Sequence, residues 1–274
     1  NKPIKKFENI KTPLNTDEII NRNILISDEQ GLGDTIQFSR FVIELLKFTK
    51  KITFVVNSKL VKILSNLDKN INVIEYKDLK INDFDFHMSL CSLPLLLRIK
   101  DINDINYNPL RFNYNNESSF KKNDINIGLS WSGNPNFPKD EYRSIKFKHF
   151  KEILNIKKIN FFKLSQNVRN EEFLDYHSFS NLFDFGDKSL FEISKIMKQL
   201  DLVISSDTSI IHLAGTLNIK SILLLNYNSD WRWFEDKKKT IWYPSVEIIK
   251  QKTFNSWDNV FYELKKRIEK LTYK

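Results

Sequence analysis

Short β-rich runs alternate with longer amphipathic runs along most of this 274-residue chain. That alternation is typical of α/β proteins, in which helices connect the strands of a parallel sheet. In the first half we expect strands at residues 24–27, 52–56, 71–75 and 84–89, and helices at about 34–49 and 58–67. In the second half we expect strands at 125–130, 159–164, 182–185, 201–205 and 221–225, with helices between them. The sequence therefore predicts an α/β fold with parallel sheets.

An irregular stretch separates the two halves. Residues 101–124 lose the periodicity and carry many Asn, one Pro and a Lys pair, as expected of a linker. We expect a Rossmann-like domain at 1–112, a linker at 113–124, a second Rossmann-like domain at 125–255, and a final helix in 256–274 that packs back on the first domain. Two such halves predict a cleft between them, at the carboxyl ends of the parallel strands.

The charge balance alone would favour an anionic partner. The chain has 43 basic and 34 acidic residues, a formal net charge of +9. However, 35 of the basic residues are Lys and only 8 are Arg, and the Lys pairs are dispersed. Since no basic stripe or RNA-binding signature accompanies them, we expect no nucleic-acid partner.

Cysteine and histidine usage excludes two further classes. Cys91 is the only cysteine, and the four histidines lie far apart in the sequence, so neither an internal disulfide nor a structural zinc site is expected. No apolar run approaches the roughly 18 residues that a membrane span needs. We expect a cytoplasmic chain without a transmembrane segment. Because it starts at Asn1 rather than Met, we also expect it to be a fragment of a longer protein.

The first candidate site follows the first predicted strand. Gly31 and Gly33 allow a tight turn there, and Asp34 falls at the start of the next helix. A dinucleotide fingerprint is unsupported, because Ile36 stands where its third glycine belongs. Two roles stay open for Asp34, a helix cap or a catalytic carboxylate.

The second candidate site follows the first strand of the second half. Trp131 lies between two serines in this loop, ahead of Gly133 and Asn134, and its indole is either buried or presented to a ligand. Arg143 comes shortly afterwards. Since Arg is scarce in this chain, Arg143 is a candidate for bidentate phosphate binding, and a solvated surface arginine is the alternative.

The third candidate site is the most specific. The predicted strand at 201–205 passes through Ser206, Asp207 and Thr208 directly into a helix, whose free amides and positive dipole end would face an anion. His212 lies four residues after Thr208, on the same helical face. An aromatic cluster follows at 227–243, which either walls a pocket or packs in the core.

Four motifs occur together in this chain in a fixed order: EQGLGDTIQF at 29–38, WSGNP at 131–135 with RSI at 143–145, DTSIIHLAG at 207–215, and DWRW at 230–233 with WYP at 242–244. In this order they resemble the glycosyltransferase domain at the C-terminus of bacterial tetratricopeptide-repeat proteins. That domain is similar to the lipopolysaccharide heptosyltransferases of glycosyltransferase family 9. The resemblance spans about residues 22–271.

The resemblance implies a GT-B fold, two Rossmann-like domains facing across a cleft, with an acceptor-side first domain and a nucleotide-sugar-binding second domain. It implies metal-independent, inverting transfer of a hexosyl or heptosyl group. Asp34 matches the family's general base, and the motif that binds the nucleotide-sugar carries over to Asp207, Thr208 and His212. Arg143 matches a basic residue that contacts the diphosphate. Ser209 replaces the usual Gly, which puts the sugar's identity in doubt.

The complete set of expected site residues is as follows. The catalytic residue is Asp34; the donor-binding residues are Trp131, Ser132, Gly133, Asn134, Arg143, Gln166, Ser206, Asp207, Thr208, Ser209 and His212; the acceptor-side residues are Gly31, Leu32, Gly33 and Gln37. No metal and no cofactor is expected besides the nucleoside-diphosphate sugar that serves as substrate.

The remaining expectations concern partners and alternatives. The acceptor would be a glycan, a lipid-linked sugar or a protein, and tetratricopeptide repeats would precede this fragment. A peripheral position at the inner face of the membrane is compatible with a cytoplasmic chain. Two other functions stay open: a non-catalytic nucleotide-sugar or acceptor-binding module, and a nucleotide-sugar epimerase of similar fold.

Overall fold

The computed structural model describes residues 7–105, 107, 109–110, 124–138, 140–169, 172, 176–234 and 240–272. The chain divides into two compact units, Asn1–Asn113 and Tyr114–Lys274. All but the last residue of the predicted linker, 113–124, lies outside the described residues. The predicted cleft concerns the relation between the two units and stays a prediction.

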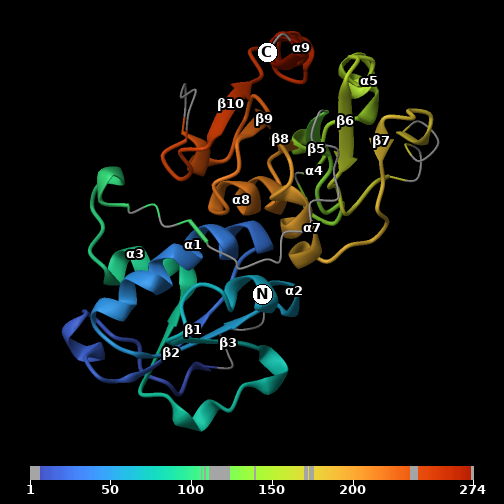
Figure 1. Ribbon diagram of the computed structural model, residues 1–274. Coiled ribbons are helices and arrows are strands. Elements are labelled where there is room, and N and C mark those ends of the chain that lie inside the picture. Colours follow the sequence, from blue (N-terminus) through green and yellow to red (C-terminus); the bar gives the residue numbers. More distant parts are fainter. Residues whose placement is uncertain are drawn as a thin grey trace. The chain divides into compact units, whose positions relative to one another are not determined.

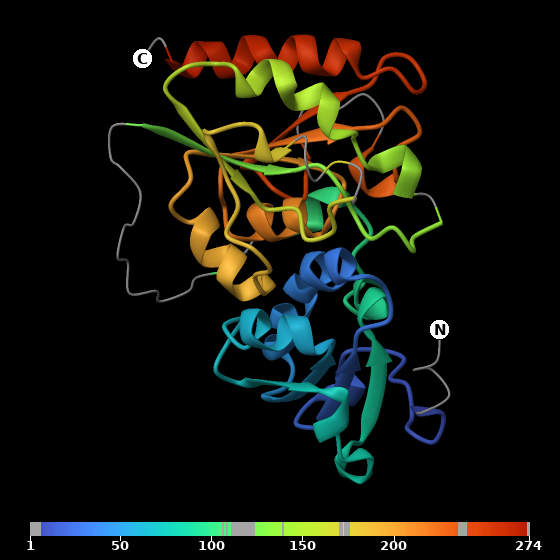
Figure 2. The same cartoon turned by 90° about the vertical axis from the view of Figure 1, so that its right-hand side faces the viewer.

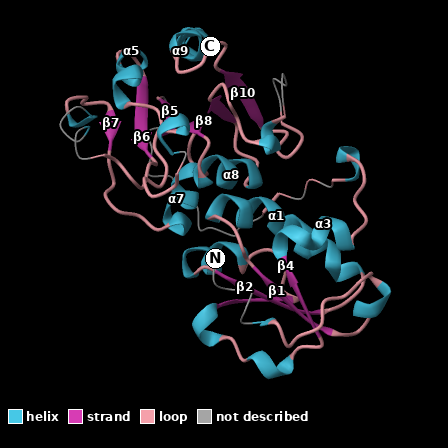
Figure 3. Ribbon diagram, turned by 180° about the vertical axis from the view of Figure 1, so that it is seen from behind, coloured by secondary structure: helices cyan, strands magenta, loops and turns pink. Residues whose placement is uncertain are grey.

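The first unit holds a parallel sheet whose strand order is β3-β2-β1-β4. Its strands are β1 (Asn23–Ser27), β2 (Lys51–Val56), β3 (Ile71–Glu75) and β4 (Phe86–Ser89); its α-helices are α1 (Leu32–Glu44), α2 (Ser58–Leu64) and α3 (Leu93–Leu96). Figure 3 shows α1 and α3 gathered above strands β1, β2 and β4. β1 pairs with both β2 and β4, so the strand order reverses beside the loop that carries the first predicted site.

His87 is a buried histidine in the core of the first unit. Its Nε2 lies 2.9 Å from the Ser27 hydroxyl, and its ring lies 4.3 Å from that of Phe7. Burial lowers the pKa of His87 to about 4. The folded chain therefore holds a neutral imidazole at pH values where an unfolded chain, with a pKa near 6.5, already binds a proton.

We expect this histidine to weaken the fold as the pH falls from about 6.5 to 4. A folded-state pKa below the unfolded value means that the unfolded state binds more protons in this window, at a cost of up to about 3 kcal/mol by pH 4. Urea denaturation at pH 7.0, 5.5 and 4.5 measures this loss of unfolding free energy. His87→Gln should lose less stability than the wild type over this range, whereas His177→Gln, at an exposed position, should match the wild type. Equal losses for wild type and His87→Gln would contradict the assignment.

The second unit holds a six-stranded parallel sheet in the order β10-β9-β8-β5-β6-β7. Its strands are β5 (Ile125–Ser130), β6 (Ile159–Lys163), β7 (Leu182–Phe183), β8 (Leu202–Ser206), β9 (Ser221–Leu225) and β10 (Val246–Lys250); its α-helices are α4 (Asp140–Arg143), α5 (Lys151–Leu154), α7 (Leu190–Met197), α8 (Ser209–Thr216) and α9 (Asp258–Thr272). The loops after β5 and β8 leave the sheet at its centre (Figure 1). Every strand expected from the sequence is present, and β10 is an addition. The prediction of an α/β fold with parallel sheets is confirmed.

The Ser-x-x-Glu sequence at Ser189–Glu192 forms a capping box at the start of α7. Glu192 Oε2 accepts a hydrogen bond of 2.8 Å from the Ser189 N–H, while the Ser189 hydroxyl accepts one from the Glu192 N–H at 3.3 Å. Each side chain satisfies a backbone donor that has no partner within the helix.

The final helix, α9, packs in the core of the second unit. Val260, Leu264 and Ile268 of α9 are buried in the core of the second unit, with side chains from α5 and from β5, β8, β9 and β10. Figure 2 shows α9 as the long helix beside α5. The prediction that 256–274 packs on the first domain concerns the relation between the two units and stays a prediction. The three apolar residues repeat every four positions and form one stripe, which the sheet of its own unit covers.

Among the described residues, no helix is both long enough and apolar enough to cross a bilayer.

Candidate functional site

The predicted donor-binding loops converge at the centre of the second sheet. β5 and β8 are neighbours in register, with Ser130 opposite Ser205. The strand order reverses between these two strands, since β6 and β7 follow on one side and β9 and β10 on the other. In parallel α/β sheets, ligands bind at the carboxyl ends of the strands at such a reversal. The loop after β5 carries Gly133 and the loop after β8 carries Asp207, so the second and third predicted sites form one candidate site.

The loop after β8 ends in a helix N-terminus. Thr208 is the N-cap of α8, and its hydroxyl accepts a hydrogen bond of 3.3 Å from the Ile210 N–H. The Ser206 hydroxyl is fully buried and has no hydrogen-bond partner within the part of the chain that the structure describes. An unpaired hydroxyl next to free helix amides is suited to an anionic ligand.

His212 is held from several sides on the second turn of α8. Its Nδ1 lies 3.0 Å from the Tyr243 hydroxyl and its Nε2 lies 3.9 Å from Asp207 Oδ1. Its ring stacks on the indole of Trp233, with centroids 5.1 Å apart at 26°. Gly215 makes the Tyr243 contact achievable, because a Cβ at this position would lie 2.4 Å from the tyrosine ring.

The Asp207 carboxyl is buried beside these groups. Burial raises its pKa, against the opposing effects of the Trp233 indole and the positive charges of Arg232 and Arg143. The charge of Arg143 therefore reaches Asp207 across the reversal point, from the loop after β5. One carboxyl and two arginines thus share the electrostatics of this site.

Arg143 is fixed by a buried carboxylate. Its Nε donates to Asp140 Oδ1 over 3.0 Å, and the side chain of Asp140 is only 4% exposed. Asp140 Oδ2 also accepts from the Ser144 hydroxyl at 2.8 Å, and the Gly133 N–H donates to that same hydroxyl at 2.9 Å. A Cβ on Gly133 would lie 2.7 Å from an Arg143 terminal nitrogen, so this guanidinium rests against the bare backbone of the loop.

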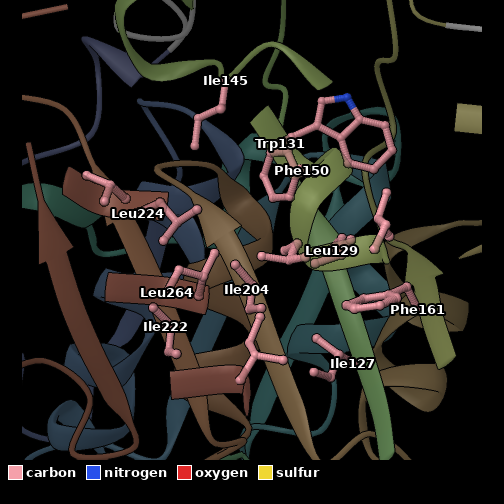
Figure 4. Close-up of a cluster of buried hydrophobic side chains, with 14 of the residues drawn as sticks. Ile127, Leu129, Trp131, Ile145, Phe150, Phe161, Ile204, Ile222, Leu224 and Leu264 are labelled. Carbon is pink, nitrogen blue, oxygen red and sulfur yellow. The ribbon is translucent and has the colours of Figure 1, made fainter. Parts of the chain in front are cut away.

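Trp131 is a core residue, so its indole takes the buried one of the two placements that the sequence left open. Its indole is fully buried, packs on Phe147 at 5.0 Å, and donates a hydrogen bond of 3.2 Å to Glu172. Figure 4 shows the indole beside Phe150 in the buried cluster of the second unit. The other Glu172 oxygen accepts from the Phe147 N–H at 2.7 Å. The indole N–H already has a buried partner in Glu172, so Trp131 anchors the start of the loop after β5 to the core.

The other expected donor residues lie on the loops of the same sheet. The Ser132 hydroxyl donates to the Asn167 carbonyl, and Gln166, exposed after β6, donates to the Lys188 carbonyl at 3.1 Å. Asn134 is exposed and accepts from the Asn136 N–H at 3.0 Å, and Ser209 opens α8 and is half-buried. The donor-binding role of these residues stays a prediction.

In the first unit, two acidic residues anchor the loop after β1. Asp28 accepts hydrogen bonds from the Tyr76 hydroxyl at 2.5 Å and from the Asn57 N–H at 2.8 Å. Burial raises the pKa of Asp28, against those two hydrogen bonds. Glu29 accepts from the Cys91 N–H at 2.9 Å. The start of the Gly-Leu-Gly-Asp turn is thus tied to β2, β3 and the segment after β4.

Asp34 is the third residue of α1 rather than its N-cap. The N-cap is Gly31, whose backbone is extended, and the Gly31 N–H donates to Asp34 Oδ2 at 3.2 Å. Leu32 and Gly33 are the first two helical residues. The Asp34 carboxylate is half-buried, so it both caps the helix and remains within reach of solvent.

Gln37, which the sequence places among the acceptor-side residues, lies inside the first unit. Its side chain is fully buried, and its amide has no hydrogen-bond partner among the described residues. Every residue of α1 from Thr35 to Val42 is buried, so the place of Gln37 in this part of the helix decides its burial.

Two groups of contacts in this site were not predicted from the sequence. Tyr243 and Trp233 contact His212. Asp140 binds both Arg143 and Arg169. The aromatic pair belongs to the 227–243 cluster, for which a pocket wall and core packing were both open. Arg169 could have been singled out in the sequence because arginine is scarce in this chain, with only 8 residues.

No protein-family model matches the chain, and no curated protein matches its sequence. Among solved structures, E. coli ADP-heptose lipopolysaccharide heptosyltransferase II is similar over 91% of this chain and 99% of its own, with a TM-score of 0.60 and 11% identity. A glycosyltransferase family 9 protein from Veillonella parvula is similar over 92% and 90%, with a TM-score of 0.61 and 13% identity. The chain shares their fold.

A third similar structure is described as containing iron. It is TibC, a dodecameric iron-containing heptosyltransferase in complex with ADP-D-β-D-heptose, similar over 91% of this chain and 66% of its own, with a TM-score of 0.58 and 11% identity. In the described part of this chain, no cluster of three or more His, Cys, Asp or Glu side chains could hold a metal ion.

Proposed function

We propose that the chain is an inverting glycosyltransferase that moves a sugar from a nucleoside-diphosphate donor to an acceptor hydroxyl. The observation that carries the proposal is the joint placement of Arg143, His212 and the N-terminus of α8 where the second sheet reverses its strand order. A site of this kind favours a diphosphate. The shared fold with heptosyltransferases, one of them solved with ADP-heptose, supports the same donor class.

In this proposal the second unit binds the donor. The α8 amides, Thr208 and Ser206 face the phosphates, Arg143 compensates their charge, and His212 supplies a hydrogen bond from its fixed ring. These groups stabilise the negative charge that builds up on the leaving nucleoside diphosphate as the glycosidic bond breaks. They supply the stabilisation without a metal ion, so we propose metal-independent transfer.

Asp34 is the proposed general base. It takes the proton of the acceptor hydroxyl, whose oxygen bonds to the anomeric carbon from the face opposite the departing diphosphate. The products are the glycoside, with inverted configuration, and a nucleoside diphosphate. The acceptor is a glycan, a lipid-linked sugar or a protein hydroxyl. We further propose a bacterial cytoplasmic setting, including the inner membrane face, and tetratricopeptide repeats ahead of this fragment.

The test is a thermal-shift panel of nucleoside-diphosphate sugars followed by a transfer assay. A donor that binds the folded chain raises its melting temperature with concentration. With that donor, we expect a candidate acceptor to gain the mass of one sugar, at a rate that EDTA changes by less than about twofold. Donor binding without transfer would favour the binding module. Epimerised donor without an acceptor would favour the epimerase.

We expect Tyr243→Phe to weaken this site by acting through His212. The change removes a hydroxyl that lies 3.0 Å from His212 Nδ1. Loss of one such hydrogen bond should lower kcat/KM for the donor about threefold to tenfold. Imidazole ¹⁵N shifts would report the tautomer of His212 directly. Tyr262→Phe, the same change at an exposed position of α9, is the control. Unchanged kinetics and an unchanged tautomer would contradict the role given to Tyr243.

A further inference from the structure

Arg169 converges with Arg143 on a single buried carboxylate. One of its terminal nitrogens lies 3.3 Å from Asp140 Oδ2, while the Nε of Arg143 holds Oδ1 at 3.0 Å. The Asp140 side chain is 4% exposed, whereas those of Arg169 and Arg143 are 30% and 22% exposed. The anion is therefore buried and both cations remain accessible.

The charges of this group do not cancel. Two guanidinium groups and one carboxylate leave one net positive charge at the carboxyl ends of β5 and β6. Asp140 is also occupied by the Ser144 hydroxyl, so both of its oxygens are already engaged. Asp140 fixes the two arginines, and its single charge leaves them attractive to a further anion.

The position of the pair matches a ligand with two phosphates. The Arg143 guanidinium lies against Gly133, where a Cβ would come within 2.7 Å, and its charge reaches Asp207 at the start of α8. Arg169 reaches the same carboxylate from the loop after the next strand, β6. A diphosphate carries acceptor oxygens on two phosphate groups, so each of the two guanidinium groups, which come from different loops, can bind one phosphate.

We propose that Arg169 and Arg143 clamp the diphosphate of the donor, with Asp140 as the positioning residue that both share. The inference rests on the proposed function for the location of the donor, and it adds Arg169 as a direct phosphate ligand. It makes the site selective for nucleoside diphosphates over monophosphates, since the second phosphate adds negative charge and acceptor oxygens for the two arginines.

The experiment is calorimetric binding of three nucleotide pairs to the full chain: ADP and AMP, UDP and UMP, GDP and GMP. The pair whose diphosphate binds best is then used with the variants. We expect Arg169→Gln to weaken diphosphate binding about tenfold and monophosphate binding by less than about twofold. Arg169→Lys, which keeps the charge but loses the fork, should fall between the two. Arg22→Gln removes one exposed positive charge from the first unit and should change neither affinity.

Repeating the Arg169→Gln measurement in an Asp140→Asn chain distinguishes direct phosphate binding by Arg169 from a role in holding Asp140. If Arg169 only held Asp140 in place, Arg169→Gln would have no further effect once Asp140→Asn has removed that carboxylate. A direct phosphate ligand still costs diphosphate affinity in the Asp140→Asn chain. Loss of that effect, equal weakening of both nucleotides, or a wild-type chain that binds no diphosphate better than its monophosphate would each overturn the clamp. Diphosphate selectivity without sugar transfer would leave the clamp standing and refute the transferase.

Discussion

Asp34→Asn should lower kcat for sugar transfer by at least about a hundredfold while donor affinity changes by less than about twofold. A positioned general base contributes roughly 10² to 10⁴ in rate, and an amide cannot accept the acceptor's proton. The amide oxygen can still accept the hydrogen bond from the Gly31 N–H, now 3.2 Å long, so the start of α1 should stay capped. Single-turnover kinetics with saturating donor, together with calorimetric donor binding, measure the two quantities.

The control for this substitution is Glu44→Gln at the last residue of α1, which makes the same change of carboxylate to amide. It should leave transfer within about twofold of the wild type. If Asp34→Asn retains more than about a tenth of the wild-type kcat, Asp34 is a helix-capping residue and another group takes the proton. A drop in melting temperature with no change in kcat would point to the same conclusion.

Trp131→Ala should destabilise the second unit by about 3–5 kcal/mol and leave donor binding by the folded chain nearly unchanged. The substitution empties a fully buried indole site and removes the hydrogen bond to the buried Glu172 carboxylate. For a unit of this size, that corresponds to a fall in melting temperature of about 10 °C. Calorimetric melting and donor titration well below the melting point test the two parts.

Trp231→Ala is the matched control, because this indole is 63% exposed and its loss should cost less than about 0.5 kcal/mol. Trp131→Phe gives a milder version, in which the ring volume is partly kept and Glu172 loses its indole partner. A Trp131→Ala chain with wild-type melting and much weaker donor binding would restore the indole to the donor site and contradict its place in the core.

Local patterns predicted most of the secondary structure. The strands at 71–75, 125–130 and 221–225 match β3, β5 and β9 residue for residue, because each is a short run that contains several aliphatic residues and has a polar residue at one end. The capping box at Ser189 also follows from the sequence, since both partners lie within one turn. β10 was missed, although three of its five residues are β-branched.

The candidate site was predictable only where its residues are close in sequence. Asp207, Thr208 and His212 share one strand-to-helix junction, so their grouping follows from the spacing alone. Arg169 and Asp140 are separated by 29 positions, and His212 and Tyr243 by 31. Such contacts depend on which strands are neighbours, and the hydrophobic pattern of a single strand carries no information about its neighbour.

By itself the sequence determined the α/β class, the order of nearly all elements and the loops that carry the chemistry, because these follow from local periodicity and capping. Tertiary structure alone decided that the Trp131 indole and the Gln37 amide are buried and that two arginines share Asp140. It also placed α9 on the sheet of its own unit. The physical reason is that burial and side-chain pairing belong to the packed sheet, whose strand order brings distant residues together.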